Sequence, residues 1–328
     1  MEYRYLGKSG LRVSLLSFGS WVTFGNQVDE ARAAELMQLA YDNGVNFFDN
    51  AEVYGHGNAE KIMGAVLKKM NWDRSSYLVS SKAFFGRGDK RPNMTGLNRK
   101  HLVEACDEAL QRLQLDHLDL YYCHRPDKHT PMEETVWTMN QLIQRGKIFY
   151  WGTSEWSAQE IMEAHMVARQ NHLIGPTMEQ PQYNMLTRHK VEVEYSQIYK
   201  TVGLGTTIWS PLAAGLLTTK YLGDGIPADS RFALGEYAWL KEKNLTDANI
   251  GVVRQLHQLA MEMGTTLPKL AVAWCAHNPN VSTVILGATR ADQLVETLQS
   301  LSVLEILTPE VHDRIESILK NKPVPPTY

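Results

Sequence analysis

The sequence predicts a (β/α)8 barrel that forms one domain over residues 1–328 and begins with a short β-hairpin. Eight apolar, strand-like runs alternate with amphipathic helical stretches along the whole chain. The length of 328 residues lies within the range of such barrels, and no Ser/Gly/Pro-rich linker divides the chain. Together these observations favour a closed barrel of parallel strands.

The strand-like segments follow one another at regular intervals. Residues 1–14, MEYRYLGKSGLRVS, alternate around a Gly-containing turn, which is typical of a small hairpin. The later runs span residues 14–20, 45–49, 77–82, 117–124, 150–154, 177–183, 205–211 and 281–287. Several of them are apolar with little alternation, as expected for parallel strands that helices cover.

The segments between these runs have helical periodicity. In residues 30–44, apolar side chains at steps of three and four share one helix face, namely those of Ala33, Leu36, Met37 and Ala40. Residues 99–113 and 131–146 are further predicted helices. Asn43-Gly44 and Arg145-Gly146 provide helix-ending chemistry.

A doubly wound open sheet is the alternative architecture for this alternation. The absence of a G-x-G-x-x-G pattern after the first strand weakens that alternative. The connection from Leu212 to Asn249 is unusually long and contains several Gly residues and Pro227. We expect this segment to close over a ligand.

Composition argues against several classes of protein. A net charge of −3 gives no basic surface for nucleic acid or an anionic membrane. Cys106, Cys123 and Cys275 are scattered without metal-ligand spacing and are expected to be buried, reduced thiols. The chain has no signal-peptide pattern and no apolar run of about 18 residues. These features predict a cytoplasmic protein that neither inserts into membranes nor holds a metal.

Polar side chains fall where consecutive predicted strands end. Asp49, Lys82 and His124 end the second, third and fourth runs, and Tyr54 follows Asp49 on the next loop. Chemistry in such barrels sits at the carboxyl ends of the strands, so these four side chains are expected to converge. A carbonyl group that accepts hydride develops oxyanion charge and needs a proton donor and prearranged hydrogen bonds. Tyr54 would be the donor, and a neutral His124 would orient the carbonyl oxygen.

A phenol needs help to act as the acid, because its ordinary pKa of about 10 makes it a poor donor at neutral pH. We expect Lys82 to supply positive charge and Asp49 to fix Lys82. Taken singly, Asp49 is explained as a cap, Tyr54 as a loop aromatic and His124 as a hydrogen-bonded core histidine. Lys82 is harder to explain in this way, because burying an unpaired lysine is costly. The ordered set on consecutive strands favours carbonyl reduction.

Nine further stretches carry a family resemblance: YRYLGKSGLRVS, WVTFG, LAYDNGVNFFDNAEVYG, SSYLVSSKAF, RPDKHTPMEETV, YWGTSEWS, WSPLAAGLLTTKY, LAVAWC and VILGATRADQLVETL. With them the chain resembles the aldo-keto reductases over nearly its whole length. It is most similar to the branch that contains the β subunits of voltage-gated potassium channels. The resemblance implies a barrel that binds NADPH without a Rossmann domain, and a catalytic tetrad of Asp49, Tyr54, Lys82 and His124.

Two departures from the channel β subunits bear on function. Those subunits generally carry Asn where this chain has His124, the common choice among active reductases. The chain also starts at the barrel, without an N-terminal extension that would plug a pore. Both departures favour an NADPH-dependent enzyme that reduces small aldehydes or ketones. The alternative is an NADP(H)-binding, redox-sensing regulatory subunit with slow turnover and a channel-type membrane partner.

Other expectations concern assembly and a third class of enzyme. Because the relatives often form tetramers, the resemblance implies a homo-oligomer. A metal-dependent barrel hydrolase is weakly supported, since His124 and His129 lack ligand spacing on neighbouring strand ends.

The resemblance also implies a set of cofactor contacts. Ser154 and Gln180 would bind the nicotinamide carboxamide, while Lys220 and Arg231 suit the pyrophosphate and the 2′-phosphate. The complete expected set is Ser20, Trp21, Gln27, Asp49, Ser154, Gln180, Trp209, Ser210, Pro211, Leu212, Ala213, Lys220, Arg231, Leu286, Gly287, Thr289, Arg290, Gln293, Glu296 and Thr297.

The segment after the last predicted strand is the expected phosphate site. Gly287 allows close approach of the backbone, and a helix from about Ala291 directs its positive N-terminal end there. The planar fork of Arg290 suits a monoester phosphate, which favours NADPH over NADH. An ordinary turn followed by a helix is the plainer explanation of this segment.

Aromatic side chains are expected to line the mouth of the substrate pocket: Trp21, Phe24, Tyr54, Phe84, Phe85 and Trp156. Such walls suit small aldehydes, dicarbonyls or aryl aldehydes. Packing in the core is the alternative explanation for the same residues. Tyr183 is a further candidate for stacking on the nicotinamide.

Overall fold

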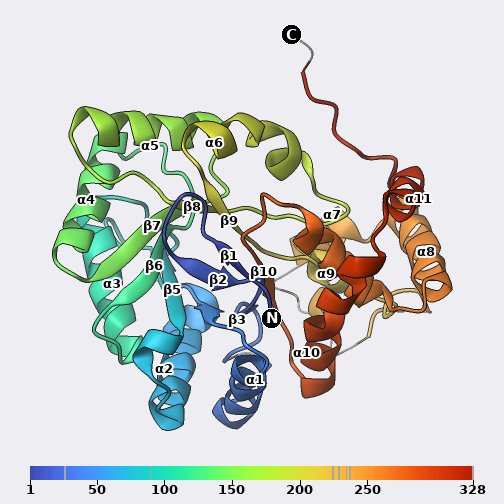
Figure 1. The fold of residues 1–328 in the computed structure, drawn as a ribbon. Coiled ribbons are helices and arrows are strands. Elements are labelled where there is room, and N and C mark those ends of the chain that lie inside the picture. Colours follow the sequence, from blue (N-terminus) through green and yellow to red (C-terminus); the bar gives the residue numbers. More distant parts are fainter. Residues whose placement is uncertain are drawn as a thin grey trace.

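A computed structural model describes residues 1–25, 27–88, 90–223, 225–227, 230–233, 235 and 238–326, with the backbone alone at Arg231 and Lys243. Eight parallel strands close into a barrel in the order β10-β3-β4-β5-β6-β7-β8-β9. Helices surround this barrel on all sides (Figure 1). The predicted (β/α)8 architecture is therefore confirmed, and the doubly wound sheet is excluded.

Each predicted strand-like run overlaps one barrel strand, although β5 ends one residue later and β7 begins two residues earlier than predicted. The barrel strands are β3 (Leu16–Gly19), β4 (Phe47–Asp49), β5 (Leu78–Ala83), β6 (Leu118–Cys123), β7 (Ile148–Ser154), β8 (Met178–Gln180), β9 (Gly205–Ile208) and β10 (Thr283–Leu286). The predicted hairpin is also present, because β1 (Tyr3–Tyr5) pairs antiparallel with β2 (Arg12–Ser14).

The hairpin covers the end of the barrel at which the strands begin (Figure 1). Its Leu6 and Val13 join a buried cluster with the barrel side chains Phe47, Leu120, Tyr122, Met178 and Ile285. At the hairpin turn, the backbone N–H of Lys8 donates to the carbonyl of Gly203, just before β9, at 2.8 Å. Gly7 has a φ of +58°, and a Cβ there would lie 2.2 Å from the same carbonyl oxygen. Only glycine permits this close approach.

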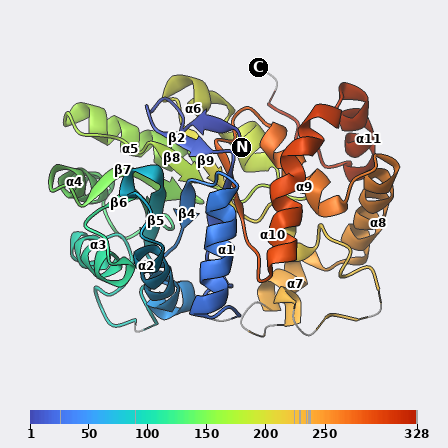
Figure 2. The same cartoon turned by 60° about the horizontal axis from the view of Figure 1, so that its bottom comes forward.

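The helices that cover the barrel are shown from a second direction in Figure 2. They are α1 (Glu30–Asp42), α2 (Asn58–Met70), α3 (Arg99–Leu113), α4 (Met132–Gln144), α5 (Ala158–Gln170), α6 (Ser196–Thr201), α7 (Ala238–Asn244), α8 (Asp247–Glu262), α9 (Leu267–His277), α10 (Ala291–Leu298) and α11 (Pro309–Leu319). Among the residues with described coordinates, no helix has both the length and the apolar character needed to cross a membrane.

Helix α1 illustrates how the sequence sets local structure. Asp29 caps its first turn by accepting a hydrogen bond from the backbone N–H of Arg32 at 2.9 Å. The predicted apolar face is buried. The helix ends at Asn43, and Gly44 follows with a φ of +83°.

The strand register brings the carboxyl ends of the strands to one rim of the barrel. Gly19 of β3 lies beside Asp49 of β4, and Lys82 of β5 lies beside Tyr122 of β6. Further around the barrel, Ser154 of β7 lies beside Gln180 of β8. Since alternate side chains of a strand point to the same face, the inward position of Phe47 also places Asp49 inside.

The long connection after β9 contains short helical segments as well as loops. These are η4 (Ala213–Gly215), η5 (Arg231–Ala233) and helix α7. Closure of this connection over a ligand stays a prediction.

Candidate active site

Lys82 lies at the centre of the predicted catalytic set. Its side chain is completely buried, and Nζ donates to Asp49 Oδ2 at 2.7 Å, Asn50 O at 2.7 Å and Tyr54 Oη at 3.1 Å. These three acceptors match the three N–H groups of an ammonium ion. Burial lowers the pKa of Lys82 from its ordinary value, and the charge of Asp49 opposes this effect. The structure thus brings Asp49, Tyr54 and Lys82 together, and their catalytic roles stay predictions.

Asp49 is held by contacts on both carboxylate oxygens. While Oδ2 accepts from Lys82, Oδ1 accepts from Ser80 Oγ at 2.7 Å and from Gln180 Nε2 at 3.1 Å. Because Gln180 comes from β8, across the barrel, the carboxylate links β4, β5 and β8. This arrangement fixes the ammonium group of Lys82 beside the phenol of Tyr54.

Tyr54 begins η1 (Tyr54–Gly57), the short turn between β4 and α2. Its ring lies among other aromatic groups, with centroid distances of 6.5 Å to Trp21 and 5.8 Å to His124. The phenol oxygen is therefore close to an ammonium on one side and to the cavity described below on the other.

His124 follows β6, and its backbone N–H donates to Ala83 O at 3.0 Å. The side chain is buried, and no described residue bonds its Nδ1. Burial lowers the pKa of His124 well below its ordinary value, and the cations Lys82 and Arg125 lower it further. The imidazole is therefore neutral at physiological pH.

A cavity of about 860 Å³ opens over this rim of the barrel. Asp49, Tyr54 and His124 line it, whereas Lys82 lies behind Tyr54. Most of the expected cofactor residues also line it: Trp21, Gln27, Asp49, Ser154, Gln180, Trp209, Ser210, Pro211, Leu212, Lys220, Leu286, Gly287, Thr289, Arg290, Gln293, Glu296 and Thr297. Three of the four predicted catalytic residues and most of the expected cofactor residues thus line one cavity.

Of the other three expected cofactor residues, two are placed away from the cavity wall and the side chain of the third is not described. Ser20 is buried and donates from Oγ to the carbonyl oxygen of Asp49 at 3.1 Å, so it supports the end of β4. Ala213 is buried and absent from the cavity wall. The side chain of Arg231 lies outside the part of the chain that the structure describes.

The prediction that six aromatic side chains line the mouth of the substrate pocket is only partly correct. Trp21, Tyr54 and Phe85 line the cavity, but Phe24, Phe84 and Trp156 do not. Phe24 packs against Phe18 in the core, with ring centroids 6.0 Å apart, and Trp156 is buried. For these side chains the packing explanation was the better one.

Tyr183 also differs from its expected place. Its ring stacks on Trp274 at 5.1 Å, and its hydroxyl donates to Glu192 at 2.8 Å. The residue is buried away from the cavity, so it has no ring face for a nicotinamide.

Arg125 is a cavity residue that the sequence reasoning missed. Its Nη1 donates to Ser154 Oγ at 3.3 Å, and its guanidinium carbon lies 5.5 Å from the centroid of Phe85. Its position directly after His124, in the sequence HRPD, was the signal that could have identified Arg125 as a site residue.

The outer wall of the cavity comes from α7, α8 and the start of α9, and nothing local in the sequence indicates this. The residues that form it are Trp239, His257, Met261, Thr265, Thr266, Leu267 and Pro268.

Glu155 is a second residue that sequence reasoning missed. Its Oε1 accepts from Trp209 Nε1 at 3.0 Å and from the backbone N–H of Gln182 at 2.5 Å. The Trp209 ring in turn meets the Trp21 ring edge-on, with centroids 5.3 Å apart. Glu155 therefore fixes the indole of Trp209 on the cavity wall.

The cavity has the features needed to hold a nicotinamide dinucleotide. Gly287 faces open space, since a Cβ there would meet no described atom within 4 Å. The Arg290 side chain does not cap α10, but the carboxylate of Asp292 accepts from the backbone N–H groups of Asp292 and Gln293 in the first turn. An anion bound at this helix end would take the place of that exposed carboxylate. Buried His257 Nδ1, also on the wall, has no hydrogen-bond partner among the described residues. Within the same residues, no cluster of His, Cys, Asp and Glu forms a metal site.

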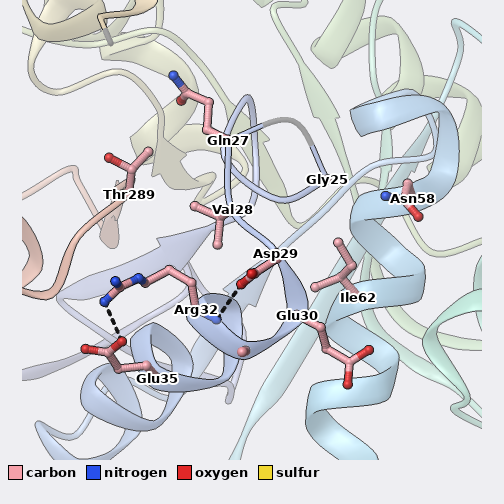
Figure 3. A pocket seen from close by; sticks show the side chains of 11 residues that line it. Gly25, Gln27, Val28, Asp29, Glu30, Arg32, Glu35, Asn58, Ile62 and Thr289 are labelled. Atoms are coloured by element: carbon pink, nitrogen blue, oxygen red, sulfur yellow. Dashed lines mark hydrogen bonds and ion pairs between the residues drawn. The ribbon is translucent and has the colours of Figure 1, made fainter.

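A second, more open hollow of about 810 Å³ adjoins this cavity and shares Gln27 and Thr289 with it (Figure 3). Three of its charged groups, Asp29, Arg32 and Glu35, already have partners at the start of α1. Asp29 caps the helix, and Arg32 pairs with Glu35 at 2.5 Å. We assign no chemistry to this hollow.

A closed parallel barrel with this tetrad at its rim defines a class of proteins. A sequence model of the aldo/keto reductase family matches residues 15–320, so the chain belongs to that family. Two relatives are named "Probable voltage-gated potassium channel subunit beta". The Oryza sativa subsp. japonica protein is 54% identical over 323 residues, which cover 98% of each chain. The Arabidopsis thaliana protein is 53% identical over 326 residues, which cover 99% of each chain.

Proposed function

We propose that this protein is an NADPH-dependent oxidoreductase that reduces aldehydes or ketones to alcohols. The observation that carries the proposal is the contact of Lys82 Nζ with both Tyr54 Oη and Asp49 Oδ2, beside a neutral His124. This arrangement suits a tyrosine that gives up a proton while negative charge grows on a carbonyl oxygen.

The cavity walls support the choice of cofactor. A bound nicotinamide cofactor would supply the hydride that goes to the carbonyl carbon. Ser154 and Gln180 offer polar groups for the carboxamide, and Trp209 offers an apolar wall beside it. Arg290, Lys220 and the first turn of α10 supply positive charge for phosphates, and the fork of Arg290 favours NADPH over NADH.

The protein's own residues would then handle the proton. Tyr54 Oη donates its proton to the carbonyl oxygen, and the Lys82 ammonium stabilises the phenolate that remains. Asp49 keeps Lys82 in place, and the neutral imidazole of His124 gives the carbonyl oxygen a hydrogen-bonding partner. Solvent returns a proton to Tyr54 after the alcohol leaves.

The walls near Tyr54 favour small substrates with an apolar or aromatic side. Trp21 and Phe85 provide apolar surface, and Arg125 adds one cation next to His124. Small aldehydes, dicarbonyls and aryl aldehydes have the matching chemistry.

The test is to follow the near-ultraviolet absorbance of NADPH, and then of NADH, with methylglyoxal and a nitrobenzaldehyde. We expect turnover, faster with NADPH. In Tyr54→Phe, turnover should fall by about 100-fold to 10,000-fold, the usual contribution of a general acid, while NADPH binding persists. Undiminished turnover in Tyr54→Phe would refute the assigned proton donor.

A regulatory subunit that senses NADP(H) is the second candidate. It is favoured by the names of the two plant relatives, which match nearly the whole chain. Tight binding of NADPH without turnover of any aldehyde in the panel would support it, with a channel-type membrane protein as the partner.

Assembly and location complete the proposal. We infer a cytoplasmic homo-oligomer, such as a tetramer. Light scattering of the purified protein at several concentrations tests the oligomer, and a monomer at every concentration would contradict it.

A further inference from the structure

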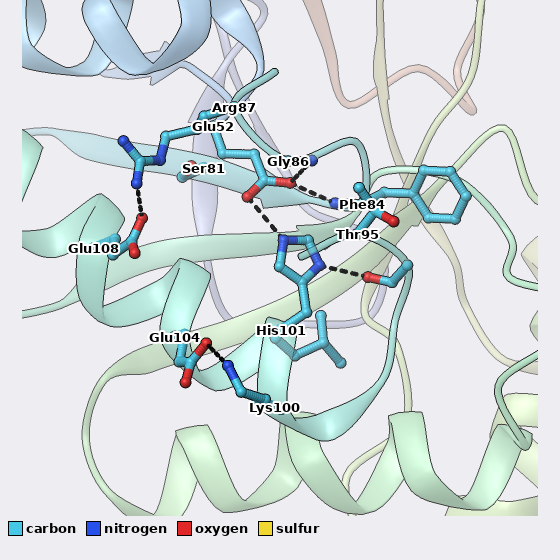
Figure 4. Close-up of polar contacts among 12 residues, drawn as sticks. Glu52, Ser81, Phe84, Gly86, Arg87, Thr95, Lys100, His101, Glu104 and Glu108 are labelled. Atoms are coloured by element: carbon cyan, nitrogen blue, oxygen red, sulfur yellow. Dashed lines mark hydrogen bonds and ion pairs between the residues drawn. The ribbon is translucent and has the colours of Figure 1, made fainter. Parts of the chain in front are cut away.

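Glu52 and His101 form a buried acid–imidazole pair, which Figure 4 shows. The pair lies close to the tetrad but outside it. Glu52 comes two residues before Tyr54, and His101 lies on α3. The Glu52 Oε2 and His101 Nε2 atoms are 3.2 Å apart, and only 2% of Glu52 and 5% of His101 is exposed. The backbone N–H of Glu52 also donates to Lys82 O at 3.1 Å. The pair is therefore attached directly to the strand that carries Lys82.

The other carboxylate oxygen of Glu52 holds the loop after β5. Its Oε1 accepts from the backbone N–H groups of Phe84 and Gly86, both at 2.8 Å (Figure 4). These two amides lie on either side of Phe85 in the chain. One carboxylate oxygen thus fixes the backbone immediately before and after Phe85.

Phe85 is the part of this loop that reaches the proposed substrate site. Its ring lines the cavity, with its centroid 5.1 Å from that of His124 and 5.5 Å from the guanidinium carbon of Arg125. A shift of the backbone at Phe85 would therefore move a wall that faces the assigned carbonyl-binding residue.

His101 completes the attachment from the far side of the loop. Its Nδ1 lies 2.8 Å from the carbonyl oxygen of Gly96, and Gly96 in turn donates its backbone N–H to Phe84 O at 2.7 Å. Carboxylate and carbonyl oxygens only accept hydrogen bonds, so both ring nitrogens must donate. This geometry requires the protonated imidazolium form.

The charge state agrees with that geometry. Burial lowers the pKa of His101, but its hydrogen bond to Glu52, the charge of Glu52 and the carbonyl of Gly96 outweigh burial and raise the pKa overall. Glu108, on the same helix, adds a smaller effect and is shared with Arg87 and Arg112. Other charged groups nearby also have partners: Lys100 pairs with Glu104, and Asp127 accepts from Leu97 N–H.

We propose that Glu52 and His101 are positioning residues that hold Phe85 as a wall of the substrate site, and so determine which carbonyl compounds the enzyme prefers. The inference rests on the proposed reductase activity. A purely structural attachment of the loop is the competing explanation, and it predicts lower stability without a change in selectivity.

The test compares Glu52→Ala and His101→Ala with Lys100→Ala. The last variant breaks the exposed 2.5 Å pair with Glu104 one residue away on the same helix, so it is the matched control. For a nitrobenzaldehyde, KM should rise about 10-fold in the first two variants, as expected when a buried charged group loses its hydrogen bonds. KM for methylglyoxal should rise less, while kcat and the Kd for NADPH stay near the parent values.

A conservative variant separates charge from shape. In Glu52→Gln, the amide oxygen still accepts from Phe84 and Gly86, and the amide NH2 group can donate to a neutral His101. This variant should keep nearly the parent selectivity and lose its pH dependence. In the parent, the nitrobenzaldehyde-to-methylglyoxal KM ratio should rise as pH passes above the raised pKa of His101, because one ring nitrogen then stops donating.

A readout without turnover decides the proposal even if the enzyme is inactive. Binding of the nitrobenzaldehyde, followed by tryptophan fluorescence, should weaken about 10-fold in Glu52→Ala and stay constant in Lys100→Ala. An inactive parent that shows this pattern refutes the reductase function but supports the positioning role. The positioning role is overturned if the parent and Glu52→Ala have the same affinity for the nitrobenzaldehyde and the same KM ratio. It is also overturned if Glu52→Ala loses as much affinity for NADPH as for the nitrobenzaldehyde.

Discussion

Lys82 shows how much of the proposed chemistry depends on a residue that does not line the cavity. Its ammonium joins Asp49, Asn50 and Tyr54, and it is completely buried. A buried lysine without acceptors would be costly, so this set of contacts is needed for stability as well as for the proposed proton transfer.

Replacing Lys82 by Met keeps the chain length of the side chain and removes its charge. We expect reduction to fall by about 100-fold or more, because Tyr54 loses the cation that stabilises its phenolate. NADPH affinity, measured by fluorescence titration, should change little, since Lys82 lies behind Tyr54.

The variant also leaves Asp49 as an unpaired buried carboxylate, which costs about 3–5 kcal/mol of unfolding free energy. Adding Asp49→Asn should therefore recover stability but not activity. Recovery of both would show that Lys82 acts only structurally.

At the level of single residues, the sequence was informative where the strand register decides the outcome. Asp49, Lys82 and His124 converge because each lies within one residue of the end of a strand, and strand ends can be predicted from the sequence. Glu52, His101 and Glu155 were missed because their partners are backbone groups and side chains of distant loops. No periodicity or motif in the sequence encodes these contacts.

Among the elements, the turn between β10 and α10 has the most specific proposed role. Gly287, Thr289 and Arg290 all line the cavity there, next to the first turn of α10. Arg290 also pairs with exposed Asp292, with Nε and Oδ1 3.2 Å apart. Because this ion pair is exposed, little free energy is lost if a phosphate replaces Asp292 as the partner of Arg290.

Arg290→Ala should weaken NADPH binding by about 10-fold to 100-fold, the usual loss for a charge-assisted contact to phosphate. NADH lacks the 2′-phosphate, so its Kd should hardly change. Calorimetric titration of both nucleotides measures the difference, and Asp292→Ala is the control on the same turn. Equal losses for NADPH and NADH would place the Arg290 contact elsewhere on the nucleotide.

The elements also differ in how well the sequence predicted them. Regular strand and helix units were predicted because their periodicity is local. The outer cavity wall of α7 and α8 was not predicted, since Trp239, His257 and Met261 reach the cavity only through packing of the long connection after β9. For Phe24 and Trp156, an aromatic near a strand end was not enough to distinguish the core from the pocket.

The pH dependence of the unfolding free energy of the whole molecule should depend on one buried acid. Glu179 of β8 is fully buried, and burial raises its pKa to about 8, while a hydrogen bond from Thr153 opposes the shift and the nearby charge of Glu155 adds to it. Above its ordinary pKa of about 4.5, the unfolded chain has released this proton, whereas the folded chain keeps it up to a pH of about 8. The unfolding free energy should therefore fall as pH rises through this range.

Glu179→Gln should remove this decline, because the amide cannot ionise and still accepts from Thr153. Calorimetric Tm values between about pH 5 and pH 9 measure the effect, with the largest gain of the variant over the parent at the alkaline end. Glu316→Gln, at a partly exposed ion pair with Arg188, is a control outside the barrel. Parallel curves for the parent and Glu179→Gln would show that the folded protein ionises Glu179 freely.

The order of the proposed site along the chain has a consequence for how such proteins diverge. The tetrad and Phe85 lie between Asp49 and His124, on β4 to β6, whereas most of the expected nucleotide contacts follow Ser154, on β7 to β10. The two halves of the coding sequence would therefore carry different properties. Selection on the first half can alter the carbonyl that is accepted, and selection on the second half can alter the coenzyme. Descendants of one ancestral gene could therefore change their carbonyl substrate while they keep the same coenzyme.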